Sequence, residues 1–262
     1  MFANFEEWLS SEAFAVFLVF ARVGMVVSLL PGFGEIYVSS RIRLMLAGML
    51  TLVLAPVVRT ALPPLPASPT ELSLLLTLEV GIGAFIGAAA RMTFNALQTA
   101  GSIVGMQTSL SAALSFDPST AQQGALTASF LGAVALIVLF AADFHHLMIR
   151  AIADSYTLFP PGQTFPAGDF AEAMTRLISS SFSLGVRMAA PFVIFGLIFF
   201  LGLGLLARLM PQMQVFFVSQ PAQILLGLIL LAGTIAAMIR VFLGSLEDSM
   251  AIFIVPPPSV LP

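Results

Sequence analysis

Six long apolar runs restrict what this chain can fold into more than any other feature of its sequence. Each approaches the about 20 residues that a helix needs to cross the hydrocarbon core of a bilayer. The connections between them are polar or rich in helix breakers. The sequence therefore predicts an all-α, polytopic helical membrane protein with about six long hydrophobic helices. The runs cover residues 13–30, 44–58, 72–90, 125–142, 188–207 and 221–239.

The composition agrees with this interpretation and excludes several classes of function. Hydrophobic residues make up 59% of the 262 residues and charged residues only 9%, against about 25% charged residues in a typical soluble domain. The net charge is −3 and no basic patch occurs, so we expect no nucleic-acid partner. The absence of cysteine excludes disulfides, thiolate chemistry and cysteine-bound metals.

The two ends of the chain and its loops predict an orientation. Three glutamates precede the first apolar run where a signal peptide carries positive charge, so we expect this run to be retained. Arg41, Arg43, Arg91 and Arg208 fall in the first, third and fifth loops. By the preference of arginine for the cytoplasmic side, this pattern places both termini outside. Three arginines in the opposite loops make the bias modest.

Two charged residues interrupt the apolar runs. Arg22 lies in the first run and Glu79 in the third. Ionisable groups inside a membrane are costly and are therefore candidates for function. They could form a buried ion pair, stabilise a subunit contact or belong to a proton path, and the first two interpretations are favoured because buried charges normally need a partner.

A short polar cluster follows the fourth run. Asp143 and His146 share a helical face, and His145 lies between them. Zinc needs three or four protein ligands and these are the only two histidines of the chain. We therefore expect no metal and no other cofactor here, and interpret the cluster as the polar end of a helix at the membrane boundary.

Small residues recur at a spacing of four in and after the third run. Gly83 and Gly87 form one pair, and Gly101 and Gly105 form another. Such pairs allow helix backbones to approach closely where lipid provides no hydrophobic driving force. We assign Gly83 and Gly87 to a subunit interface.

The chain becomes polar after Gly105, over a central loop that covers residues 105–124. The segment 105–118 ends in Asp117-Pro118, which favours a turn. Irregular backbone beside a membrane must be buried in protein or line an aqueous cavity. The segment is therefore predicted to line or plug a pore, and a loop that only fills space is the alternative. The residues assigned to the pore or plug are Gly105, Met106, Gln107, Leu110, Leu114, Phe116, Asp117 and Pro118.

Four blocks of sequence, in order, resemble one family. They are PGFGEIYVSSRIRLMLAG (31–48), TAGSIVGMQTSLSAALSFDP (99–118), FHHLMIRAIADSYTLFPPG (144–162) and GLLARLMPQMQVFFVSQP (204–221). The family is that of the flagellar biosynthetic protein FliR, a subunit of the type III export gate. The chain departs from the family pattern at several positions, among them Ser109, where the loop usually has glycine, and Phe144, where a glycine often precedes the histidine.

The resemblance implies a non-catalytic subunit of a helical assembly. Its partners would be FliP and FliQ, with FlhB and FlhA nearby, and unfolded export substrates would pass through the centre. The location would be the bacterial inner membrane, in the flagellar basal body. The resemblance also divides the chain into a FliP-like portion, residues 1–181, and a FliQ-like helical hairpin with its tail, residues 182–262.

The tip of this hairpin is a candidate subunit contact. It combines two prolines, expected to end the flanking helices, with two adjacent phenylalanines that a solvated turn would not need. Four glutamines, Gln212, Gln214, Gln220 and Gln223, could form hydrogen bonds across chains. An ordinary membrane-surface turn is the alternative. The residues assigned to the contact are Arg208, Pro211, Gln212, Phe216, Phe217 and Pro221.

Other functions remain as alternatives. A secondary transporter of a small solute or ion could use Arg22, Glu79 or Asp143 as a coupling site, but no internal repeat is found. The equivalent subunit of a virulence type III secretion system would carry the same blocks. An intramembrane enzyme ranks last, because the sequence contains no H-E-x-x-H motif, no G-x-S-x-G motif and no cysteine.

Overall fold

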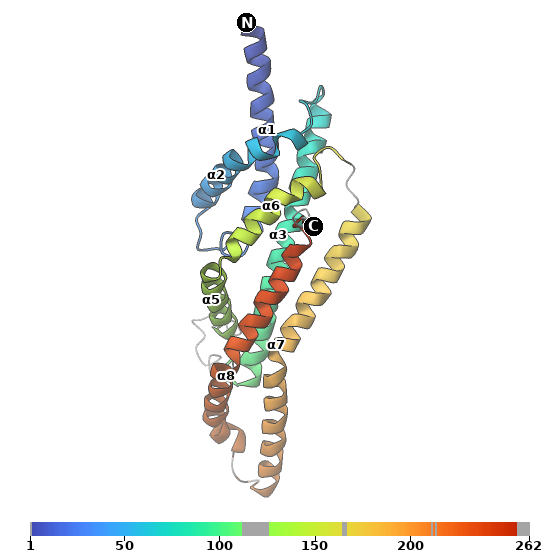
Figure 1. Ribbon diagram of the computed structural model, residues 1–262. Helices are drawn as coiled ribbons and strands as arrows, with labels where there is room; N and C mark the ends of the chain where they lie inside the picture. Colours follow the sequence, from blue (N-terminus) through green and yellow to red (C-terminus); the bar gives the residue numbers. More distant parts are fainter. Residues whose placement is uncertain (1, 112–125, 164–166, 211, 213, 256–262) are drawn as a thin grey trace, which may run out of the picture. The chain divides into compact units, whose positions relative to one another are not determined.

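The computed structural model describes residues 2–111, 126–163, 167–210, 212 and 214–255, and these residues form helices and connecting turns without a β-strand (Figure 1). The predicted all-α fold is therefore confirmed. The elements are α1 (Phe2–Leu29), α2 (Ser40–Val58), the short 3-10 helix η1 (Arg59–Ala61), α3 (Pro69–Gln107), α5 (Leu126–Ala141), α6 (Phe144–Leu158), α7 (Ala167–Leu209) and α8 (Val215–Ala251).

The helices follow the apolar runs but are mostly longer than them. Among the described helices, α1, α2, α3, α7 and α8 are each long and apolar enough to cross a bilayer. Helix α3 continues past the third run to Gln107, so residues 91–107 belong to the same helix. The fourth run forms α5, whose 16 residues are fewer than the about 20 that span a bilayer.

Local sequence signals explain where two of the helices begin. Ser68 precedes α3 and its hydroxyl accepts a hydrogen bond from the Glu71 N–H at 3.3 Å. Pro69 occupies the first helical position, where its missing N–H has no helical partner to lose. In the same way, the Ser39 hydroxyl accepts from the Ile42 N–H at the start of α2. Serine at such a position stabilises the helix by satisfying a free backbone donor.

Asp143 separates α5 from α6. Its φ of +59° lies in the left-handed region, which aspartate tolerates better than most residues. This backbone conformation ends α5, and α6 leaves at an angle of 74°. The two helices together are therefore a bent pair, which raises the number of possible membrane crossings in the described chain from five to six.

The predicted role of Pro221 as a helix end is wrong. The residue lies on the second turn of α8, which already begins at Val215. Proline inside a helix removes one backbone hydrogen bond, but apolar helices tolerate this where neighbouring groups and local adjustment satisfy the freed carbonyl. The turn between α7 and α8 is consequently short, and Phe217 belongs to the first turn of a helix.

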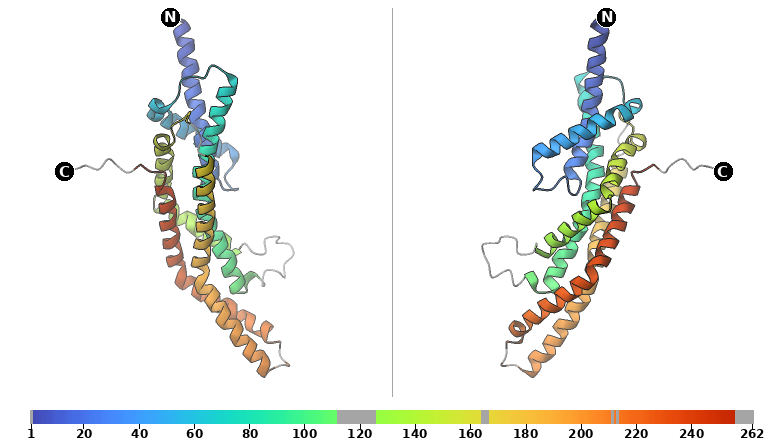
Figure 2. Two further views of the ribbon diagram at one scale, coloured as in Figure 1. Left: turned by 90° about the vertical axis from the view of Figure 1, so that its right-hand side faces the viewer. Right: turned by 60° about the vertical axis from the view of Figure 1, so that its left-hand side comes forward.

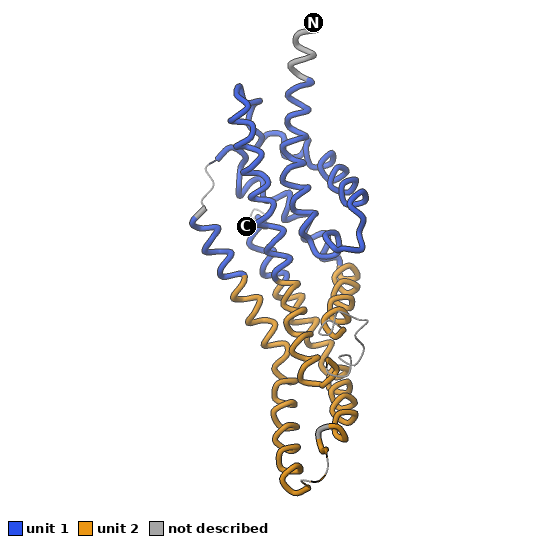
Figure 3. Tube along the Cα trace, turned by 180° about the vertical axis from the view of Figure 1, so that it is seen from behind, with its two compact units in different colours: residues 1–92, 143–177, 246–262 blue, residues 93–142, 178–245 orange. Residues whose placement is uncertain are grey.

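The chain divides into two compact units (Figure 3). Unit 1 contains residues 1–92, 143–177 and 246–262, and unit 2 contains residues 93–142 and 178–245. Helices α3, α7 and α8 contribute residues to both units. The division into FliP-like and FliQ-like portions at residues 181 and 182 falls within α7 and stays a prediction.

In unit 1, α1 packs against α2 and α3 (Figures 1 and 2). A Cβ atom on Gly83 would lie 2.5 Å from the Arg22 carbonyl oxygen, and one on Gly87 would lie 2.7 Å from the Leu29 Cβ. Only glycine allows α1 and α3 to approach this closely. The assignment of Gly83 and Gly87 to a subunit interface is therefore corrected: the pair packs two helices of the same chain.

In unit 2, the second small-residue pair packs α3 against α5. A Cβ atom on Gly101 would clash with the backbone of Ala128. The rings of Phe94 and Phe242 meet edge to face, with 6.0 Å between their centroids, and join α3 to α8. Helices α7 and α8 run side by side as the predicted hairpin (Figures 1 and 2).

Large apolar side chains remain exposed along whole helix faces. On α2 they recur about every turn, and on α7 they form a similar row. Exposed apolar surface of this extent marks contact with lipid or with another protein. The exposed residues are Ile42, Met45, Met49, Leu52, Val53 and Val57 on α2, and Ile194, Leu197, Ile198, Leu201 and Leu205 on α7.

Candidate functional site

Arg22 is the most completely buried charged side chain described, with no exposed surface. It lies in the C-terminal half of α1, within unit 1. Its Nε donates to one Glu79 carboxylate oxygen at 2.7 Å, and its Nη2 donates to the other at 3.0 Å. This two-point arrangement is the strong geometry for an arginine and a carboxylate.

Helix α6 supplies the remaining acceptors. The Nη1 of Arg22 donates to the backbone carbonyl and the hydroxyl of Ser155, at 3.0 and 3.1 Å. Its Nη2 also donates to the Phe159 carbonyl at 2.8 Å, just after the end of α6. The guanidinium thus has five N–H groups and five acceptors. The Ser155 carbonyl also accepts the Phe159 N–H at 2.8 Å, so Arg22 adds a second donor to a carbonyl in the last turn of α6.

An aromatic ring completes the enclosure of the charge. The Arg22 guanidinium carbon lies 4.0 Å from the centroid of the Tyr156 ring, within the range of a cation–π interaction. The Tyr156 hydroxyl donates to the Val19 carbonyl at 3.4 Å. Glu79 is only 1% exposed. The sequence left three roles open for Arg22 and Glu79: a buried ion pair, a subunit contact or a proton path. The structure shows a buried ion pair that is enclosed by residues of the same chain.

The polar cluster between α5 and α6 offers three ligand atoms. Atoms of Asp143, His145 and His146 lie within 4.8 Å of one another. The Asp143 and His146 side chains are 74% and 71% exposed, and the Asp143 Oδ1 lies 3.7 Å from the His146 Nδ1. A closed zinc site takes four ligands, and the described residues supply three here. Asp143 and His146 are exposed at the beginning of α6 and His145 is partly buried; the interpretation of the cluster as a polar helix end at the membrane boundary stays a prediction.

The predicted plug begins as helix rather than as irregular backbone. Gly105, Met106 and Gln107 form the last turn of α3, so this part of the prediction is wrong. The helix continues two positions past Gly105 to Gln107, whose side chain lies against Gly196 of α7. Leu110 is partly buried. The other predicted plug residues, Leu114, Phe116, Asp117 and Pro118, lie outside the described residues.

Within unit 2, the end of α3 packs against α7 and α8. The buried side chain of Gln223, on α8, donates to the Gln107 carbonyl at 2.8 Å. Side-chain atoms of Gln107 lie against Gly196 of α7, and those of Thr108 against Gly227 of α8, so closely that neither glycine has room for a Cβ.

The role of Gln223 is a correction to the sequence analysis. We expected this glutamine to form a hydrogen bond across chains, but it satisfies a carbonyl at the end of α3. Gln223 lies among apolar residues of α8, which indicates that its side chain is buried. A buried amide needs a hydrogen-bond partner. Nothing in the local sequence identifies that partner, which lies 116 positions away.

Ser109, which follows Thr108, has a strained backbone conformation. Ser109 has a φ of +57°, in the left-handed region that costs a side-chain-bearing residue about 1–2 kcal/mol relative to glycine. This is the position where the resemblance predicts glycine. The strain identifies the point at which the chain turns away from α3.

The tip of the α7–α8 hairpin is mostly exposed, and Val215 at the start of α8 is partly buried. Arg208 is exposed at the end of α7, Gln212 is exposed in the turn, and Pro221 is exposed on α8. The Phe217 side chain is 65% exposed. Pro211 and the Phe216 side chain lie outside the described part of the structure. The chain itself therefore leaves this apolar and polar surface uncovered.

The buried pair generates a stability prediction. Replacing Arg22 by methionine leaves a buried carboxylate without its partner, which costs about 3–5 kcal/mol. Replacing both Arg22 and Glu79 by methionine should recover part of this loss, because no lone charge remains. Thermal unfolding of the purified protein in mild detergent measures both effects.

A matched control comes from an exposed pair on α7. Arg176 and Glu172 are 78% and 65% exposed, and such pairs contribute less than about 1 kcal/mol. Glu172→Gln should therefore leave the melting temperature nearly unchanged. If Arg22→Met melted at the same temperature as Glu172→Gln, the stabilising role of the buried pair would be wrong.

Comparison with known proteins supports one family. Residues 13–249 match the family described as bacterial export proteins, family 1. The flagellar biosynthetic protein FliR of Caulobacter vibrioides is 40% identical over 242 residues, which cover 92% of this chain and 96% of that protein. FliR of Bacillus subtilis is 31% identical over 220 residues, covering 83% and 84% of the two chains.

A protein of a different system is also similar. The Yop proteins translocation protein T of Yersinia pestis is 28% identical over 164 residues, which cover 61% of this chain and 62% of that protein. The family match and the long apolar helices together identify a multi-pass membrane protein. The chain belongs to the bacterial export proteins of family 1, which include the flagellar biosynthetic protein FliR.

Proposed function

We propose that the chain is a non-catalytic subunit of the flagellar type III export gate. In this role it joins FliP and FliQ around a passage for unfolded flagellar substrates, in the inner membrane at the flagellar basal body, with FlhB and FlhA nearby. The observation that carries the proposal is the family match over residues 13–249, joined to similarity with FliR of Caulobacter vibrioides over nearly its whole length.

The exposed surfaces of the structure support a role as a subunit. Described apolar faces on α2 and α7 are left uncovered by the chain, and the hairpin tip is exposed as well. Faces of this size require lipid or protein around them. Sibling subunits that pack against the hairpin would cover such a surface.

The buried pair argues against the transporter alternative. A coupling ion must reach its site from each side of the membrane in turn. The Arg22 and Glu79 side chains are 0% and 1% exposed and bind one another at both carboxylate oxygens. A virulence secretion subunit remains the second candidate, because similarity extends to the Yop translocation protein T.

The hairpin tip is our candidate contact with partner subunits. Phe217 and the neighbouring Val218 are both about two-thirds exposed at the start of α8. Aromatic residues in a buried interface centre contribute about 2 kcal/mol or more at the strongest positions. Arg208 at the end of α7 and Gln212 in the turn are polar and exposed, and both can complete such a contact with hydrogen bonds.

The segment that follows α3 is our candidate plug. It starts from a fixed point, because Gln107 and Thr108 are packed against the hairpin. Met106 is exposed beside this point and Leu110 is partly buried. Apolar side chains in a constriction exclude water and ions, so residues 109–118 can seal a passage at rest. Attachment to the hairpin would couple the seal to movements of neighbouring subunits.

The first test concerns export itself. Deleting the gene should abolish secretion of late flagellar substrates and swimming, because the passage would lack one of its subunits. Secretion is measured in the culture supernatant, and expression of the wild-type chain from a plasmid should restore it. Normal flagellar secretion in the deletion strain would contradict the proposal, and loss of only a virulence secretion activity would favour the second candidate.

The second test concerns the hairpin tip. Phe217→Ala should reduce recovery of FliP and FliQ with the tagged chain while the abundance of the chain stays normal, because the residue faces away from its own fold. Ile178→Ala on α7 removes a similarly exposed apolar side chain far from the tip in sequence and serves as the control. Equal recovery of partners with both variants would contradict the subunit contact and favour an ordinary membrane-surface turn at Phe217.

The third test concerns the plug. Residues 109–116 are replaced by eight glycine and serine residues, which keeps the loop length and spares the buried Thr108. Loss of the apolar side chains should make the resting membrane leak ions and small molecules. Leakage is measured by dye uptake and by decay of an ion gradient in cells that contain the assembled gate.

A single substitution provides the control for this variant. Ser109→Gly relieves the left-handed strain and keeps every apolar side chain of the segment, so the membrane should remain tight. If the glycine–serine replacement assembled normally and the membrane stayed as tight as in the wild type, the plug would be refuted. The assignment as an export subunit would not depend on that outcome.

A further inference from the structure

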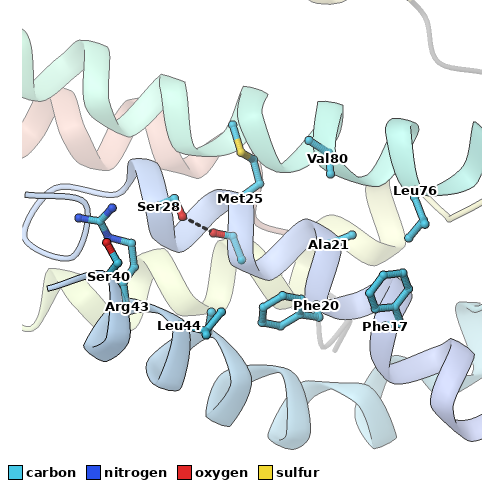
Figure 4. A pocket seen from close by; sticks show the side chains of 12 residues that line it. Phe17, Phe20, Ala21, Met25, Ser28, Ser40, Arg43, Leu44, Leu76 and Val80 are labelled. Carbon is cyan, nitrogen blue, oxygen red and sulfur yellow. Dashed lines mark hydrogen bonds between the residues drawn. The ribbon is translucent and has the colours of Figure 1, made fainter. Parts of the chain in front are cut away.

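An apolar groove lies between α1, α2 and α3 in unit 1 (Figure 4). Its volume is about 580 Å³, within the range of about 300–1,000 Å³ that is typical of sites for small molecules. Phe17 and Phe20 of α1, Leu44 of α2 and Leu76 of α3 are among the apolar side chains that line it. The groove belongs to none of the surfaces discussed above.

The two ends of the groove differ in polarity. Figure 4 shows Ser28, Ser40 and Arg43 together at one end, and Phe17 and Leu76 at the other. The Ser28 hydroxyl already donates to the Gly24 carbonyl at 2.7 Å. No acidic residue is part of the lining. The groove is therefore a long apolar surface with one cationic end.

The charge of Arg43 is held in place but is not neutralised. Its Nε donates to the Phe33 carbonyl at 3.2 Å, and its Nη2 donates to the Glu35 carbonyl at 3.0 Å. Carbonyl groups orient a guanidinium without cancelling its charge. The Glu35 carboxylate pairs instead with Arg91, at 2.6 Å.

A second arginine adds to the positive charge at this end. Arg41 is exposed on the first turn of α2, and within the described chain neither Arg41 nor Arg43 forms an ion pair with a carboxylate. Together with Arg91, three arginines and one glutamate leave an excess of positive charge here. Arginines in short loops next to membrane helices face anionic headgroups.

We propose that this groove binds an anionic phospholipid. An acyl chain lies along the apolar side chains of α1, α2 and α3, and the phosphate of the headgroup contacts Arg43 and the Ser40 hydroxyl. Two features support this assignment. The cationic end of the groove suits an anionic headgroup, and the apolar side chains along the rest of the groove suit a hydrocarbon chain. The bound lipid would fill the space between α1 and α2 and contact both helices.

The size of the groove favours a lipid chain over a helix of another protein. A helix with its side chains is about 10–12 Å wide and rises 5.4 Å per turn, so one turn occupies about 400–600 Å³. The groove could hold little more than one turn. An extended hydrocarbon chain is much thinner and can follow the groove along its length.

The test uses the full-length protein purified in mild detergent and native mass spectrometry with added lipid. Phosphatidylglycerol should bind as one retained molecule per chain, at least tenfold more tightly than phosphatidylcholine. Arg43→Gln keeps a hydrogen-bond donor for the loop carbonyls but removes the charge, and should lower phosphatidylglycerol binding about tenfold. Gly24→Leu should lower it as well, by filling the groove, because a Cβ at Gly24 has ordinary contact distances only.

Arg240→Gln is the control, because Arg240 is an exposed arginine on α8, outside the groove, and phosphatidylglycerol binding should not change. Equal retention of the two lipids, or full retention by both groove variants, would overturn the proposal. In the assembled complex, a photoreactive group at Leu44 should crosslink to lipid. Crosslinking to a partner subunit in its place would show that protein occupies the groove.

Discussion

The ion pair between Arg22 and Glu79 is the interaction on which unit 1 depends. Its two charges are removed from water entirely, and such a removal is tolerated only where every donor finds an acceptor. The five N–H groups of Arg22 meet two carboxylate oxygens, two carbonyls and one hydroxyl. These acceptors come from α3 and from the end of α6. One side chain thus joins α1 to two segments that are far from it in sequence.

The glycine pair on α3 makes this interaction possible. Gly83 lies one helical turn after Glu79, and its missing side chain leaves room for the Arg22 carbonyl. The close approach of α1 and α3 brings the guanidinium within 2.7 Å of the carboxylate. Small residues and buried charge therefore act together, since lipid would provide neither a hydrophobic driving force between the helices nor a hydration shell for a lone ion.

Apolar patterning predicts nearly all the helices and the C-terminal hairpin, because the length of an apolar run and its breakers are local properties of a sequence. Contacts between distant segments were less predictable. The charge of Arg22 required a partner and Glu79 was the natural candidate, but nothing local indicated Ser155 or Tyr156 of α6. The prediction that Pro221 ends a helix was wrong, because a long apolar helix can accommodate a proline that would end a helix of a soluble protein.

The surfaces that the chain leaves uncovered fit the proposed role as a subunit of a larger assembly. The core of the chain is closed around a buried ion pair, while its helix faces and hairpin tip remain uncovered. The most direct test is the native mass of the tagged chain after purification from its own membrane in mild detergent. The account predicts a complex several times heavier than the 27.7 kDa chain, containing FliP and FliQ. Recovery of the chain alone, as a monomer or a homodimer, would contradict it.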